Sequence, residues 1–160
     1  IAAIAGPAVA GGMELALWAD IRVMENTAYM GVYCRRWGIP LIDGGTVRLP
    51  RLVGEGRAMD LILTGRRVDA REALEIGLCE YLVPEDEARK KAEELAHDIA
   101  RFPQSCMRAD RRSVQSQRGM TLRDALRQEW RGSKAEVTKG IEGAALFARG
   151  KGRGGDFNDE

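Results

Sequence analysis

The first third of the chain alternates between short apolar runs and glycine-rich turns. Ile1–Ala5 is an apolar run typical of a buried strand, and Asp20–Met24 alternates polar and apolar residues as a half-buried strand does. Between them, the glycines and proline of Gly6–Gly12 predict a turn, and Met13–Trp18 consists largely of good helix formers. Tyr29–Tyr33 again favours an extended segment. This order of strand, turn, helix and strand predicts an α/β fold class.

The middle of the chain predicts a loop followed by short elements. The sequence GIPLIDGG contains three glycines and a proline, which predicts a loop. Asp69 is followed three residues later by Glu72, the capping-box pattern that starts a helix. In order, we expect a loop at 38–45, helices at 44–52, 56–63 and 69–76, and a strand at 78–83.

The last part of the chain is predicted to be helical. Apolar residues recur at helical spacing after Pro84, and Thr121 with Asp124 resembles a helix start. Helices are expected at about 85–101, 105–117 and 121–149. We therefore expect an α/β part at residues 1–84, a helical region at 85–150 and a disordered, glycine-rich and acidic tail at 151–160.

The composition describes a folded chain of about one ordinary domain. It has 160 residues, of which 44% are hydrophobic and 31% charged, and a formal net charge of +1. The apolar stretches are shorter than the roughly 20 residues of a membrane helix, so we expect no membrane partner. Three widely spaced cysteines and one histidine argue against a disulfide framework or a metal site. We expect a reducing, cytoplasmic compartment, and a chain that starts inside a longer protein.

The charges are distributed unevenly. Residues 1–100 carry 12 basic and 16 acidic side chains, whereas residues 101–153 carry 13 basic and 5 acidic ones. A basic region attracts phosphates of a cofactor or a nucleic acid, and it is equally typical of a solvated arginine-rich helix face. Because aromatic residues do not interleave with the basic ones, we expect no nucleic-acid partner.

The stretch AVAGGMEL, residues 8–15, is the strongest candidate for chemistry. Gly11 and Gly12 lie at the start of the predicted helix, where free backbone N–H groups can hold a developing oxyanion. Glu14 follows within the first turn, in reach of a carbonyl compound bound there. The same pattern also fits glycines that allow close packing and an acid that is favourable in a first helical turn.

Three blocks of sequence together resemble the enoyl-CoA hydratase/isomerase (crotonase) superfamily. They are IAAIAGPAVAGGMELALWADIRV, GIPLIDGGTVRLPRLVG and AMDLILTGRRVDAREALEIGLCEYLVP. The resemblance implies a partial spiral of ββα turns, lacking its N-terminal part, followed by a helical trimerisation region. It also implies an acyl-CoA thioester substrate, polarised by two backbone N–H groups, and a homotrimer or hexamer. Coenzyme A would arrive with the substrate, and no separate cofactor or metal is implied.

The resemblance assigns roles to individual residues. Gly11 matches one of the two oxyanion N–H donors, with Gly12 beside the substrate, and Glu14 matches the first of two hydratase glutamates. The second glutamate would fall at position 34, where this chain has Cys34. That thiol is either a packing residue or a poor proton donor at neutral pH. Asp43 matches a position used for catalysis by isomerase and dehalogenase branches, and it also fits a turn or helix cap.

The sequence therefore predicts a site with two carboxylates, Glu14 and Asp43. Such a pair moves a proton between carbons, or adds water across a double bond when water is admitted. The other candidate contacts are Trp37 in the acyl pocket, Phe147 and Lys151 on coenzyme A, and Arg35 or Arg36 either beside a carboxylate or as surface cations. We expect an enzyme, an enoyl-CoA hydratase or isomerase, of which this piece alone need not be active. The alternative is a family member that binds acyl-CoA or assembles without catalysis, since Cys34 replaces an acid.

Overall fold

The computed structural model describes residues 1–150, which form two units. The first unit is Ile1–Ile99, and the second begins at Ala100. The division falls inside helix α5, Ala88–Arg101.

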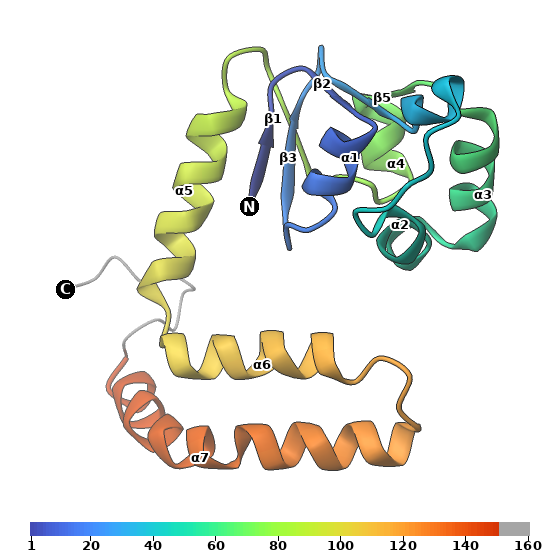
Figure 1. The fold of residues 1–160 in the computed structure, drawn as a ribbon. Helices are drawn as coiled ribbons and strands as arrows, with labels where there is room; N and C mark the ends of the chain where they lie inside the picture. Colours follow the sequence, from blue (N-terminus) through green and yellow to red (C-terminus); the bar gives the residue numbers. More distant parts are fainter. Residues whose placement is uncertain (151–160) are drawn as a thin grey trace. The chain divides into compact units, whose positions relative to one another are not determined.

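The first unit contains a parallel sheet whose strand order is β1-β3-β6, of which β1 and β3 lie side by side in Figure 1. Its strands are β1 (Ala2–Ile4), β3 (Arg22–Glu25) and β6 (Tyr81–Val83). All four residues of β3 are buried, as expected of a central strand in a parallel sheet. The strands expected at 1–5, 20–24 and 78–83 are thereby confirmed, with bounds shifted by a few residues.

A second sheet has the order β2-β4-β5, in which β2 and β4 are parallel and β4 and β5 antiparallel. Its strands are β2 (Pro7–Val9), β4 (Tyr29–Gly31) and β5 (Val68–Asp69). The prediction of a simple turn throughout Gly6–Gly12 is wrong, because β2 lies within it. Proline is tolerated there as the first residue of a strand at the edge of its sheet. The pairing with β4, about 20 residues away, has no local signal.

Short helices lie between the strands. They are α1 (Gly11–Ala16), α2 (Gly45–Val53), α3 (Glu55–Thr64) and α4 (Ala70–Glu75), with the 3₁₀ helix η1 (Tyr33–Trp37) after β4. The carboxylate of Asp69 accepts the N–H of Glu72 at 2.9 Å, which confirms the predicted cap of α4. The expected strand end at Tyr33 is wrong, since that residue opens η1.

One hydrophobic core joins these elements. The buried side chains come from both sheets and from α1 to α4, and the largest include Met13, Met24 and Leu61. Arg22 is buried among them at 1% exposure. Its guanidinium donates to the carbonyls of Leu78 at 3.0 Å and Ala19 at 2.6 Å, and forms an ion pair with Glu80. Glu80 itself is exposed, and the buried acids are Glu14 and Glu25, the latter accepting the N–H of Ala88 at the start of α5.

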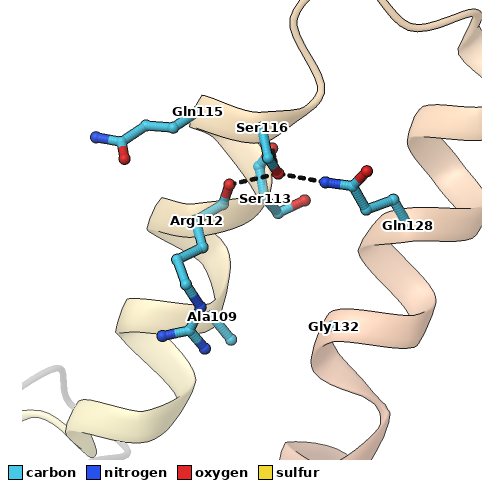
Figure 2. A pocket seen from close by; sticks show the side chains of 7 residues that line it. All are labelled: Ala109, Arg112, Ser113, Gln115, Ser116, Gln128 and Gly132. Atoms are coloured by element: carbon cyan, nitrogen blue, oxygen red, sulfur yellow. Dashed lines mark hydrogen bonds between the residues drawn. The ribbon is translucent and has the colours of Figure 1, made fainter.

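The second unit consists of α6 (Gln104–Ser116) and α7 (Leu122–Ala148), which run side by side as a hairpin (Figure 1). Thr121 caps α7 by accepting the N–H of Asp124 at 3.2 Å, as predicted. A groove between the two helices is lined by polar side chains (Figure 2). There the hydroxyl of Ser116 donates to the carbonyl of Arg112 and accepts from the amide of Gln128.

Candidate active site

A strained turn at Ala10 leads from β2 into α1. Ala10 adopts φ 54° and ψ −127°, a conformation that costs a residue with a side chain on the order of 1 kcal/mol or more. Two hydrogen bonds hold the turn: Ala10 donates to the carbonyl of Gly31 at 2.9 Å and accepts from the N–H of Glu14 at 3.1 Å. The turn leaves Gly11 and Gly12 exposed, and helix geometry gives their N–H groups no acceptor within α1. These N–H groups can therefore bind a carbonyl oxygen.

Glu14 joins α1 to the loop at 38–45. Its side chain is buried, at 3% exposure, and its Oε1 accepts the backbone N–H groups of Asp43 at 3.0 Å and Gly45 at 2.8 Å. Hydrogen bonds to an ionised carboxylate are stronger than those between neutral groups. Within the described residues, Oε2 of Glu14 accepts no hydrogen bond. Oε1 of Glu14 thus holds the loop to α1 through two backbone hydrogen bonds.

The carboxylate of Asp43 lies beside Gly11. A Cβ atom placed on Gly11 would sit 3.5 Å from Oδ2 of Asp43, and Asp43 is itself exposed. Position 45 lies closer still to the other carboxylate, since a Cβ there would be 2.8 Å from Oε1 of Glu14. The structure therefore brings together the three predicted catalytic residues, from α1 and from a loop about 30 positions further along the chain.

Two residues that sequence reasoning missed also contact this loop. The indole Nε1 of Trp18 donates to the backbone carbonyl of Asp43 at 2.8 Å. The guanidinium carbon of Arg48 lies 4.5 Å from the centre of the Trp18 ring. No local pattern indicates either contact, because Trp18 and Asp43 are 25 positions apart.

The segment from Cys34 to Trp37 does not bond to these carboxylates. Cys34 is buried in η1 as part of the hydrophobic core, and within the described residues no hydrogen bond joins it to Glu14 or Asp43. Trp37 is 81% exposed. Arg35 donates to the carbonyl of Ile62 at 3.1 Å and Arg36 to that of Gly65 at 3.3 Å, so both arginines bind the C-terminal end of α3. Arg36 also stacks on the Tyr33 ring at 3.7 Å.

The remaining predicted contacts lie outside this group. Phe147 belongs to α7 in the second unit and is 56% exposed. Lys151 and the tail predicted at 151–160 lie outside the described residues. In residues 1–150, no cluster of three or more histidine, cysteine or acidic side chains is arranged to hold a metal ion. The helices of this range are also too short or too polar to cross a lipid bilayer.

Comparisons with known proteins cover nearly the whole chain. Residues 1–148 match the profile of the family described as enoyl-CoA hydratase/isomerase. Over 102 residues the chain is 49% identical to YngF of Bacillus subtilis, named as an enoyl-CoA hydratase/isomerase, covering 62% of this chain and 38% of YngF. It is 39% identical over 127 residues to the enoyl-CoA hydratase EchA19 of Mycobacterium tuberculosis, and the match covers 79% of this chain and 48% of EchA19.

The fold leads to the same group of proteins. The crystal structure of an enoyl-CoA hydratase from Bacillus anthracis superposes with a TM-score of 0.85 at 36% identity, covering 90% of this chain and 57% of that one. The chain thus spans about half the length of the curated relatives it matches, 38% of YngF and 48% of EchA19.

Proposed function

Because the chain belongs to the enoyl-CoA hydratase/isomerase family, we propose that the protein carrying it is an enzyme acting on an unsaturated acyl-CoA thioester. The observation that supports this proposal is the grouping of the Gly11 N–H, buried Glu14 and exposed Asp43. An oxyanion donor next to two carboxylates suits proton transfer at carbons beside a carbonyl.

The first task in the proposed mechanism is to stabilise an enolate. The N–H of Gly11 donates to the thioester oxygen, which gains negative charge as a proton leaves the neighbouring carbon. The resemblance implies a second N–H donor from an earlier segment of the family's fold. Two such donors act without metal chemistry, and coenzyme A is part of the substrate rather than a separate cofactor.

The two carboxylates have different surroundings and take different tasks. Glu14 already accepts two backbone N–H groups on Oε1, and its Oε2 orients the substrate or a water molecule. Asp43, which is exposed and lies beside Gly11, transfers the proton. Return of that proton to another carbon gives isomerisation. In hydration no proton leaves carbon first: water oriented by Glu14 loses a proton to a carboxylate as its oxygen bonds to the β-carbon, and the enolate that forms, held by the Gly11 N–H, takes that proton at the α-carbon.

A second candidate function is binding of acyl-CoA without turnover. The observation that favours it is Cys34, which packs in the core at the position where hydratases carry their second glutamate. In this reading Glu14 is a structural anchor of the loop, and Asp43 is a turn residue.

We further propose assembly as a homotrimer or hexamer. Its support is the row of exposed apolar residues on α7, the helix that matches the family's trimerisation region. Among residues 1–150, no other part of the structure buries a residue of α7.

The experiment that tests the proposed function measures the addition of water to the acyl chain and the exchange of its carbon-bound hydrogens. The natural protein that contains this sequence is incubated in deuterated water with crotonyl-CoA, a 3-enoyl-CoA and a dienoyl-CoA, and both 3-hydroxyacyl product and deuterium uptake are measured. Asp43→Asn is expected to lower the rate by roughly 10²–10⁴-fold, the usual contribution of a general acid or base. Glu14→Gln keeps an oxygen acceptor for the two N–H groups and should lower hydration more than isomerisation.

A matched control is Glu75→Gln on α4, where the carboxylate is exposed and forms no described ion pair. It should leave all rates unchanged. Absence of turnover and exchange on every thioester, with equal acyl-CoA affinity for wild type and both site variants, would instead support the binding function.

A further inference from the structure

Trp18 lies just beyond the end of α1, the helix that carries Gly11 and Glu14. Its side chain is 59% exposed, so burial does not explain the orientation of the ring. The ring is instead held by its polar and charged contacts, since Nε1 donates to the Asp43 carbonyl at 2.8 Å and the Arg48 guanidinium stacks on the ring at 4.5 Å. A cation over an indole contributes about 0.5–1 kcal/mol at an exposed site.

The backbone at Gly44, next to Asp43, leaves room for Arg48 to stack on Trp18. Gly44 adopts φ +96°, a conformation that strains residues with side chains. A Cβ at this position would collide with Nη1 of Arg48 and lie 4.0 Å from Nε1 of Trp18. Trp18, Gly44 and Arg48 therefore form one compact contact on the loop.

The backbone of Asp43 is held from two directions. Its N–H donates to Oε1 of Glu14 at 3.0 Å, and its carbonyl accepts from Nε1 of Trp18 at 2.8 Å. These bonds fix the peptide groups on both sides of Asp43. The direction of its Cα–Cβ bond follows from the two peptide planes, and so does the place of the carboxylate beside Gly11.

We propose that Trp18 is a positioning residue, whose indole N–H holds Asp43 in place for proton transfer. The inference deepens the proposed function and rests on it, because Asp43 is the proton-transfer group there. A displacement of about 1 Å at a reacting group can lower a rate by 10²-fold. Loss of the one hydrogen bond from the Trp18 indole to the loop, with the hydrogen bonds to Glu14 intact, is expected to have a smaller effect.

The decisive variant is Trp18→Phe, which keeps an aromatic ring over which Arg48 can lie and removes the N–H. In the natural protein, kcat is expected to fall by about 10-fold while KM stays within about 2-fold, since the loss concerns proton transfer rather than binding. The same substitution in an Asp43→Asn background is expected to cause no further fall, because Trp18 acts through that carboxylate. An equal fall in both backgrounds would overturn the inference.

A second measurement does not depend on catalysis. Hydrogen exchange at the amides of Asp43 and Gly45, read in wild type and Trp18→Phe, reports how firmly the loop is held. We expect about fivefold faster exchange in the variant, the effect of losing one ordinary hydrogen bond. Tyr81→Phe on β6 is the control, since it also removes a polar atom while keeping an aromatic ring, and this tyrosine is 38% exposed and its hydroxyl has no described hydrogen bond. It should leave loop exchange unchanged.

The activity and the hydrogen-exchange measurements together distinguish a failure of the positioning role of Trp18 from a failure of the proposed function. Unchanged loop exchange in Trp18→Phe overturns the positioning role, whatever the activity. Faster exchange in a protein that turns over none of the thioesters keeps Trp18 as the residue that holds the loop, and rejects the proposed function alone.

Discussion

The two units of the chain are stabilised in different ways. In the first unit, buried side chains from two sheets and four helices form one core, and buried polar groups such as Arg22 and Glu14 have their hydrogen-bond partners. Among the described residues of the second unit, Ala109 is the one that is buried. The candidate site lies in the first unit, and a fixed arrangement of catalytic groups requires such a supporting core.

The second unit leaves a row of large apolar side chains exposed on α7. They recur at intervals of four and seven positions, which places them along one side of a helix: Leu122, Leu126, Trp130, Val137 and Ile141, each at least 56% exposed. Helices in water derive most of their stability from packing of such a face. The first unit is therefore held by its own core, whereas the apolar face of α7 stays exposed among the described residues.

The largest effect is expected from Arg22→Met in the first unit. The substitution removes the ion pair with Glu80 and the donors to the carbonyls of Leu78 and Ala19. Arg22 is buried whereas Glu80 is 36% exposed, so the main cost is that the buried Leu78 carbonyl and the partly buried Ala19 carbonyl lose their donor, at about 1–3 kcal/mol for each unsatisfied group. We expect a loss of this size in the free energy of opening of β3, measured by native-state hydrogen exchange of its amides.

The control for this prediction is Arg66→Met. Arg66 pairs with Asp60 and Glu72, but its side chain is 39% exposed. The hydrogen bonds that Arg66 donates to the carboxylates of Glu72 and Asp60 raise its pKa, yet solvent screening keeps the contribution of exposed pairs within about 1 kcal/mol. Equal losses in the two variants would contradict the claim that burial distinguishes them.

A second prediction concerns the alkaline stability of the first unit. Burial, together with the charge of Glu80, raises the pKa of the Cys79 thiol to about 11. Above the ordinary thiol pKa near 9, the unfolded chain releases its proton while the folded chain keeps it. Rising pH therefore favours unfolding, and the stabilisation present at pH 8 is lost between about pH 9 and 11.

The measurement is urea unfolding at pH 8 to 11. Within the window, wild type is expected to lose up to about 1.4 kcal/mol per pH unit more than Cys79→Ala, which has no thiol to titrate. Leu78→Ala is the control, because it removes a buried neighbour without changing ionisation. It should lower stability equally at each pH. If the unfolding free energies of wild type and Cys79→Ala fell in parallel with rising pH, the raised pKa of the Cys79 thiol would be refuted.

The sequence predicted the fold best where the signal is local. The caps at Asp69 and Thr121 are made within three residues, and both are confirmed. Strand β2 was missed because glycine and proline dominate its surroundings, while its pairing with β4 joins distant segments. The prediction that Tyr33 ends a strand failed since the backbone tightens there into η1.

In the candidate site, too, the sequence predicted the local relationships and missed contacts between distant segments. Gly11 and Glu14 are one turn of α1 apart, so a helix start was sufficient to place them together. The place of Asp43 beside them came from the family resemblance, and the structure supplies its physical cause in the Glu14 hydrogen bonds. Trp18 was missed because an indole at the end of a helix has no pattern that specifies a partner 25 positions away.

The smallest changes in stability are expected when one glycine in each unit is replaced by alanine. Gly38 and Gly140 both have open space where a Cβ would be added, so their alanine variants differ mainly in backbone conformation. Gly140 lies inside α7, where alanine should stabilise the helix by about 0.8–1 kcal/mol. Gly38 adopts φ +71°, where alanine should destabilise the first unit by about 1 kcal/mol. Amide exchange in each unit measures both changes. A Gly140→Ala variant with faster amide exchange in α7 would contradict the expectation and would indicate that the added methyl group meets a partner outside the described residues.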